Sequence, residues 1–211
     1  MFIEEANKLL EPGYLPLETG YMPLSNGQWL IAALTRMPGV TGVMLDWWMG
    51  SYLDSTEKYK LWDSNHLRFE WDEHKKPGEF IGASHICEEK QGPIHLKLRI
   101  KFEDPATYLD TSRFAEADIQ TAVACTVYSI DWSNVYSRIV WVARTTEDGI
   151  EQRFRAWDTK GTPETARGGL THTIGEMARQ AQFLPTLYAT NGKVFLKPGE
   201  AFAENARRSM T

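Results

Sequence analysis

A series of strand patterns followed by one long amphipathic helix is the feature that most constrains the fold of this chain. Between residues 94 and 102, Leu96, Leu98 and Ile100 alternate with polar side chains, so one face of this strand is expected to be buried and the other wet. Related patterns predict strands over residues 66–72, 80–89, 119–130, 136–144 and 150–157. We therefore expect a sheet to form most of the core, with a single helix packed against it.

The closing helix is marked at its start and along one side. Thr162 and Pro163 are typical of an N-cap and a first helical position. Gly168-Gly169 weakens the first part, so the firm helix is expected from near Leu170, and Pro185 is expected to kink or end it. The apolar stripe consists of Leu170, Ile174, Met177, Ala181 and Leu184.

Turn signals organise the remaining segments. Asn26-Gly27 predicts a β-hairpin between residues 15 and 37, and Asp148-Gly149 predicts a tight turn between the last two strands. Thr41 is a suitable cap for a short helix. Residues 54–65 form a polar and then aromatic stretch to which no element is assigned.

Antiparallel strands followed by one long helix indicate the α+β class. A curved sheet wrapped around a helix leaves a cavity between the two, where a small apolar ligand would bind. The length of 211 residues predicts a single domain over 1–211, with a tail over 190–211 that no pattern places.

Charge and composition exclude several classes of partner. The net charge is −5 and no cluster of Lys and Arg stands out, which argues against nucleic acid. No apolar run approaches the roughly 20 residues of a membrane span, and the acidic N-terminus is unlike a secretory signal. Two cysteines do not make a disulfide framework, so we expect a soluble, cytoplasmic protein. Aromatic residues make up 12% of the chain, which favours an aromatic-lined cavity and is compatible with a homodimer.

Two histidines and two glutamates are candidate metal ligands. His172 and Glu176 are four residues apart in the predicted helix, which places them on one face, one turn apart. His66 opens a strand, and Glu88-Glu89 ends the next strand candidate. Such a set could hold a divalent ion with one position open for water, although the helical pair alone also fits an exposed surface pair.

Three blocks of the sequence, in this order, resemble the family of 2,4-diacetylphloroglucinol hydrolase and phloretin hydrolase. The blocks are Asp46-Trp47-Trp48 with Tyr59-Lys60-Leu61-Trp62 and His66; Gly82-Ala83-Ser84-His85-Ile86-Cys87-Glu88 with Leu96-Lys97-Leu98-Arg99-Ile100 and Asp104-Pro105; and residues 148–157 with His172, Glu176, Phe183-Leu184-Pro185, Leu187 and Tyr188. The likeness extends roughly from residue 20 to residue 190.

The resemblance implies a START-like helix-grip fold with a curved antiparallel sheet around the C-terminal helix. It also implies a Zn2+ ion held by two His and two Glu, and hydrolysis of a carbon–carbon bond between a phenolic or polyketide ring and an acyl group. Carried over by motif, the ligands are His66, Glu88, His172 and Glu176. Glu89 is the alternative to Glu88, because only one of two neighbouring strand residues can point inward, and the alternation with His85 and Cys87 favours Glu89.

Further residues are expected around the substrate. Tyr59 and Asn65 are candidate catalytic residues that could hold a phenol hydroxyl. The candidate aromatic wall comprises Trp47, Trp48, Tyr59 and Trp62. The resemblance also implies another histidine near residues 136–144, and none lies there. This departure keeps two alternatives open on the same scaffold: a polyketide cyclase, decarboxylase or isomerase, and a non-catalytic protein that binds an apolar ligand.

Overall fold

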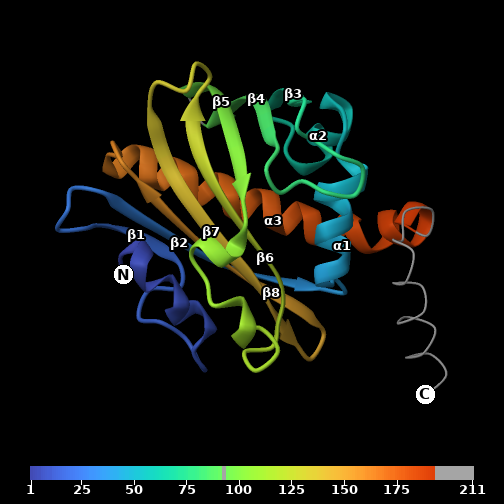
Figure 1. Cartoon of the computed structure of the whole chain (residues 1–211), viewed down its shortest axis with the longest axis horizontal. Helices are drawn as coiled ribbons and strands as arrows, with labels where there is room; N and C mark the ends of the chain where they lie inside the picture. Colours follow the sequence, from blue (N-terminus) through green and yellow to red (C-terminus); the bar gives the residue numbers. More distant parts are fainter. Residues whose placement is uncertain (92–93, 193–211) are drawn as a thin grey trace.

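One sheet of eight antiparallel strands forms the body of the protein in a computed structural model that describes residues 1–91 and 94–192 (Figure 1). The spatial order of the strands is β1-β2-β8-β7-β6-β5-β4-β3. The strands are β1 (Gly20–Pro23), β2 (Trp29–Pro38), β3 (His66–Trp71), β4 (Ser84–Gln91), β5 (Ile94–Glu103), β6 (Ile119–Ser129), β7 (Val135–Thr146) and β8 (Gly149–Asp158).

Helices lie on both sides of this sheet. The α-helices are α1 (Gly42–Trp47), α2 (Thr56–Trp62) and α3 (Pro163–Asn191), and a π-helical turn, η2 (Trp48–Tyr52), continues α1. Short 3-10 helices are η1 (Ile3–Leu10), η3 (Pro105–Thr107) and η4 (Thr111–Arg113). The long helix α3 crosses one side of the curved sheet, whereas η1 lies on the other side (Figure 1). This arrangement confirms the predicted α+β helix-grip fold.

The turn signals are confirmed, and one helix was missed. Gly27 has a φ of 84°, the left-handed conformation that the tight turn between β1 and β2 requires. The hydroxyl of Thr41 accepts a hydrogen bond from the backbone of Met44 and caps α1. Helix α2 occupies the stretch to which no element was assigned, and Ser55 caps it by accepting a hydrogen bond from the backbone N–H of Lys58.

Helix α3 is continuous from Pro163 to Asn191, so it does not become firm only near Leu170, contrary to the prediction, and of the two effects predicted for Pro185 the helix does not end there. A Cβ atom on Gly169 would lie 3.2 Å from Cδ1 of Ile31, so glycine lets the helix approach β2 closely. The residue before the proline, Leu184, is fully buried. Tertiary packing therefore outweighs the local weakness of glycine and proline in this helix.

Of the three apolar clusters among the described residues, the two largest lie on opposite faces of the sheet. The larger one fills the space between the sheet, α1, η2 and α3. The other lies beneath η1, where Glu18 forms ion pairs with Arg153 and Arg155 of β8 at 2.6 and 2.7 Å. Both arginine side chains are fully buried. The N-terminal segment therefore covers one face of the sheet and leaves the other to face α3.

Some predictions concern residues outside the described part of the chain. Residues 92 and 93 lie outside it, as does the predicted tail over 190–211 from residue 193 onward, whereas Thr190 and Asn191 belong to α3. Both cysteines are free and buried. Among the helices of the described residues, none is long and apolar enough to cross a membrane.

Candidate metal centre

Two histidines and two glutamates from three elements converge at one wall of the space between the sheet and α3. Nε2 of His172 lies 2.9 Å from Oε2 of Glu89, and Nε2 of His66 lies 3.0 Å from Oε1 of Glu176. The remaining separations are 3.5 Å between His172 and Glu176, and 4.0 Å between His66 and Glu89, measured from Nε2 to the nearest carboxylate oxygen. We call His66, Glu89, His172 and Glu176 the four-residue cluster.

The pairing of β3 with β4 explains why His66 and Glu89 share a face. The two residues lie directly opposite each other in the antiparallel register, and opposite residues project on the same side of a sheet. A β-bulge between His66 and Arg68 shifts the alternation of β3. As a result Leu67 is 37% exposed and His66 is fully buried. Without the bulge, the alternation that runs back from Phe69 would turn His66 toward solvent.

Glu88 projects from the opposite face of β4, contrary to the prediction that named it as a ligand. Its carboxylate oxygens lie 3.8 Å from Nη1 of Arg68, 3.4 Å from Nζ of Lys97 and 3.3 Å from Nε2 of His95. Neighbouring residues of a strand point to opposite faces, so Glu88 and Glu89 cannot both face inward. The alternative, Glu89, is the glutamate that the structure brings to the two histidines.

Helix α3 supplies the other half of the cluster and anchors it. His172 and Glu176 lie on one face of the helix, as their spacing predicted. Asp63, at the end of α2, lies 3.7 Å from Nδ1 of His172 through its Oδ2 atom. Arg179, also on α3, donates hydrogen bonds to the same carboxylate and to the carbonyl of Trp62. Asp63 and Arg179 therefore tie α3 to α2, and sequence patterns had singled out neither residue.

Hydrogen bonds orient His66 and Glu89. Nδ1 of His66 lies 2.9 Å from the carbonyl oxygen of Tyr59, so Nδ1 carries a proton and Nε2 is the nitrogen that can bind a cation. The Tyr59 hydroxyl donates to Oε1 of Glu89 at 3.2 Å, and Sγ of Cys87 is 3.4 Å from the same oxygen. The ring of Tyr59 also stacks on His66, with centroids 3.7 Å apart. These contacts resemble the outer shell that orients ligands in metal sites.

The protonation equilibria of the cluster are strongly coupled. Burial disfavours the charged form of His172, but the carboxylates of Glu176, Glu89 and Asp63 outweigh it and raise the pKa of His172 to about 9. Burial likewise acts against ionised Glu89, yet His172 and His66 bring the pKa of Glu89 down to about 2. Burial raises the pKa of Tyr59 well above its usual range, so its hydroxyl remains a donor.

The donor set fits a divalent cation. Nε2 of His66 is buried, and its one close polar neighbour among the described residues is the carboxylate of Glu176 at 3.0 Å, with which it makes no hydrogen bond of good geometry. In the same part of the chain, neither Glu89 nor Glu176 forms an ion pair with Lys or Arg. Ligand atoms of His66, Glu89 and His172 all lie within 4.8 Å of one another, and Glu176 contacts both histidines. Mixed nitrogen and oxygen ligands suit zinc, and also iron or manganese.

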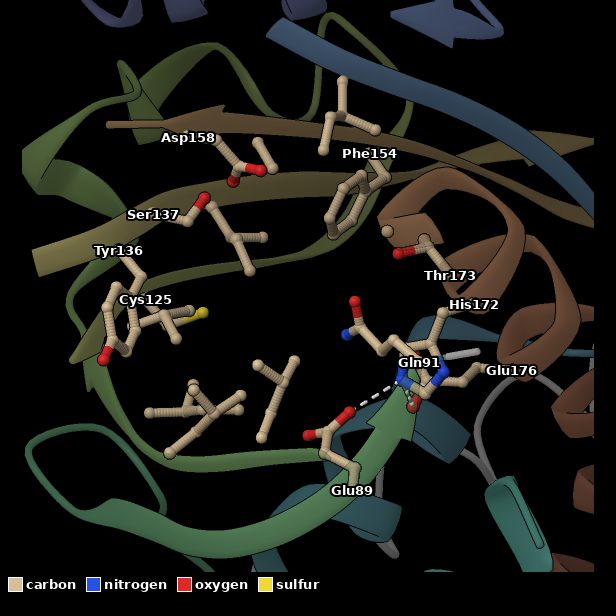
Figure 2. Close-up of a pocket in the computed structure, with 18 of the residues that line it drawn as sticks. Glu89, Gln91, Cys125, Tyr136, Ser137, Phe154, Asp158, His172, Thr173 and Glu176 are labelled. Atoms are coloured by element: carbon tan, nitrogen blue, oxygen red, sulfur yellow. Dashed lines mark ion pairs between the residues drawn. The ribbon is translucent and has the colours of Figure 1, made fainter. Parts of the chain in front are cut away.

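The cluster borders a largely apolar cavity of about 340 Å³ between the sheet and α3 (Figure 2). The apolar lining includes Leu98, Val123, Val127, Ile139, Phe154 and Met177. Two other lining residues, Ile94 and Tyr136, are 38% and 39% exposed, so the cavity reaches the surface beside them. A cavity of this size and lining can hold a small molecule with an aromatic ring.

The predicted catalytic and aromatic residues are only partly in this cavity. Tyr59 and Trp62 line it, whereas Trp47 and Trp48 pack in the apolar core outside its lining. Asn65 is exposed, and its backbone N–H donates to Asp63, so the prediction that Asn65 holds a substrate hydroxyl is not supported by its position. Its place directly before the strand, on the solvent side of the bend, explains the difference.

His85 is a further buried histidine that lines the cavity. It lies on the same face of β4 as Glu89, and its Nε2 atom is buried with no hydrogen-bond partner among the described residues. The rings of Trp71, Phe102 and Phe69 surround it at centroid distances of 4.1, 4.6 and 4.7 Å. Burial holds its pKa well below the usual range, so this imidazole is neutral. The alternation along β4 was the signal that could have identified it.

Comparisons with known proteins identify relatives of this chain. Phloretin hydrolase of Eubacterium ramulus is 26% identical over 200 aligned positions, covering 81% of this chain and 71% of that protein. The 2,4-diacetylphloroglucinol hydrolase of Pseudomonas protegens is 27% identical over 166 positions, covering 74% of this chain. The match spans 54% of that relative, or about half its length.

Solved structures are less similar to this chain than these two hydrolases are. The crystal structure of Ara h 8.0201 matches 74% of this chain and 99% of its own with 12% identity and a TM-score of 0.48, too distant to support a functional conclusion. The model of the DAPG hydrolase PhiG domain, in contrast, matches residues 1–189. Because this match covers most of its length, the chain belongs to the DAPG hydrolase PhiG domain family.

Proposed function

We propose that this protein is a zinc-dependent hydrolase that cleaves the carbon–carbon bond between a phenolic or polyketide ring and an acyl group. The observation that carries the proposal is the convergence of two imidazoles and two carboxylates at the wall of an apolar cavity. The relationship to phloretin hydrolase and 2,4-diacetylphloroglucinol hydrolase supports the reaction class. His66, Glu89, His172 and Glu176 are the proposed ligands.

The chemistry of the leaving group limits the substrate. Zinc, when bound, would polarise an acyl carbonyl and lower the pKa of a water molecule toward about 7. Hydrolysis adds the hydroxyl of water to the acyl carbon and returns a proton to the ring carbon, giving a carboxylic acid and a phenol. A carbon leaving group is tolerable only if the ring can accept the charge, as a hydroxylated ring next to a ketone does. The apolar walls of the cavity suit such a ring.

The side chains around the proposed ligands have distinct roles. The carbonyl of Tyr59 holds His66 in the tautomer with Nε2 unprotonated, and its hydroxyl orients Glu89. Tyr59 is therefore proposed as a positioning residue. Asp63, bonded to Arg179, faces Nδ1 of His172 and favours the proton on that nitrogen. Apolar lining residues exclude bulk water and strengthen electrostatic interactions in the site.

Metal analysis of matched variants tests the ligands directly. Glu89→Gln and His172→Ala should each lower zinc content and metal affinity by at least about tenfold, since each removes a donor. Glu88→Gln is the matched control: it makes the same chemical change one residue away, on the opposite face of β4, and should leave zinc content unchanged. Equal zinc content in all four proteins, wild type included, would remove the proposed site.

An activity assay separates hydrolysis from binding alone. The wild type, incubated with an acylphloroglucinol, should release the corresponding carboxylic acid, which chromatography can quantify, and Glu89→Gln should not. The apolar lining of the cavity also favours a non-catalytic protein that carries an apolar ligand. Absence of stoichiometric metal together with a co-purifying hydrophobic molecule would support that second function and contradict the first.

A further inference from the structure

A second polar group lies in the cavity, on the wall opposite the four-residue cluster. Figure 2 shows the side chains of Asp158 and Ser137 on one side of the cavity and those of Glu89, His172 and Glu176 on the other. Asp158 ends β8, and Ser137 lies directly opposite it on β7 in the antiparallel register. The two side chains therefore project together from the same side of the sheet into the same cavity.

Asp158 forms no ion pair with Lys or Arg in the part of the chain that the structure describes, although its side chain is only partly exposed to water. The nearby cation, Lys160, donates a hydrogen bond to Oδ1 of Asn134 instead. Burial raises the pKa of Asp158, and the hydroxyl of Ser137 offsets only part of this effect. A carboxyl group placed against apolar walls without a cation costs free energy, and a donor on a ligand would add to the single hydrogen bond that Ser137 offers.

We propose that Asp158 and Ser137 form a second polar subsite, which accepts a hydrogen bond from a neutral hydroxyl group that the substrate carries on the side away from its reacting carbonyl. The subsite rests on the proposed function only in taking this cavity as the place where substrate binds. A ligand that fits both walls has a polar group at each end and an apolar middle that contacts Ile139 and Phe154.

The chemistry of the subsite selects among polar groups. A carboxylate at this position would meet Asp158 and be repelled, and a methyl ether would offer no proton. An ammonium group would be attracted to Asp158 but repelled by Lys160, which lines the same part of the cavity. A phenolic or alcoholic hydroxyl is the group that can donate to the carboxyl oxygen without carrying a charge of its own.

A binding experiment with simple probes tests the subsite without turnover. The full chain is titrated with 4-butylphenol, with its methyl ether 4-butylanisole and with 4-butylbenzylamine, while tryptophan fluorescence reports on Trp141 and Trp62, which line the cavity. The wild type should bind the phenol about tenfold more tightly than the ether, as expected for a hydrogen bond to a carboxylate. Asp158→Leu should abolish this preference, and Ser137→Ala should reduce it.

Asp148→Asn and Asp158→Asn form a matched pair for the same titrations. Asp148 lies in the turn at the opposite end of the same two strands, is exposed and does not line the cavity, so its variant should keep the wild-type preference. Asp158→Asn should lose most of it, because a neutral amide oxygen is a weaker acceptor than a carboxylate. The preference is a ratio measured within each protein, so it reports on the subsite even if a variant is less stable.

The outcomes separate the subsite from the proposed reaction. An unchanged preference in Asp158→Leu and Asp158→Asn, no preference in the wild type, or tighter binding of the amine than of the phenol would overturn the subsite. Zinc binding and acyl cleavage could still be observed in that case, and the proposed function would stand. An Asp158-dependent preference in a protein that cleaves no acylphloroglucinol would support the subsite and reject the reaction.

Discussion

The charge of His172 in the metal-free protein should make folding stability depend on pH. Its folded-state pKa is about 9, against an ordinary value of 6.5. At about 1.4 kcal/mol per pH unit, this difference corresponds to roughly 3 kcal/mol of stability. Because the folded-state pKa is raised, the contribution is complete below pH 6.5 and is lost as the pH rises through 9.

The interaction between His172 and Glu89 also changes the pKa of Glu89, which falls from 4.5 to about 2. A lowered carboxyl pKa stabilises the fold above pH 4.5, and this stability disappears as the pH falls toward 2. The two contributions describe one coupled pair and are not added. Between pH 4.5 and pH 6.5 both groups are charged in the folded state, and the cluster is at its most stabilising.

Urea unfolding in the presence of EDTA, at pH 6 and at pH 9.5, measures this effect. The free energy of unfolding of the wild type should fall by about 3 kcal/mol more than that of His172→Gln over this interval. The variant keeps a polar side chain of related size but cannot become cationic, so it isolates the ionisation. If both proteins lost the same free energy within about 1 kcal/mol, the ion pairs of His172 would not stabilise the fold as the structure implies.

Three further predictions use other parts of the structure. Zinc must displace protons from the cluster, so zinc affinity should rise by up to about tenfold per pH unit between pH 6.5 and 9, and a flat affinity in competition titrations would contradict this. Gly168→Ala should raise the free energy of unfolding by about 1 kcal/mol, because a Cβ there meets no atom within 4 Å, whereas Gly169→Ala should gain less because its Cβ would lie 3.2 Å from Ile31. Glu18→Gln should lower the free energy of unfolding by about 3 kcal/mol, because it leaves Arg153 and Arg155 buried without a counter-charge, and a loss below 1 kcal/mol would contradict this role.

Local patterns predicted most of the secondary structure because its determinants are local. The alternation of apolar and polar residues located β5, and Asn26-Gly27 and Asp148-Gly149 located two hairpin turns, since side-chain period and backbone conformation depend on a few neighbouring residues. Helix α2 was not predicted, because its short, polar first turn shows little helical periodicity. Helix α3 continues through Gly168-Gly169 and Pro185 because packing against the sheet compensates for the low helix propensity of these residues.

The candidate site was predictable in its composition but only partly in its geometry. The spacing of His172 and Glu176 fixes their shared face by helix geometry alone. The choice between Glu88 and Glu89 depends on which face of β4 meets α3, and the pairing of His66 with Glu89 decides it. Asp63, Arg179 and Asp158 carry no local signal, because their roles arise from contacts with residues distant in the sequence.

By itself the sequence determined the order of the elements, the α+β class and the residue types that could hold a metal ion, because each of these follows from neighbours along the chain. Only the tertiary structure decided which side chains meet. One β-bulge beside His66 turns that histidine inward, and the curvature of the sheet around α3 sets two polar groups on facing walls of one cavity. A bulge and a curvature depend on pairing across the whole sheet, and no short stretch of sequence encodes them.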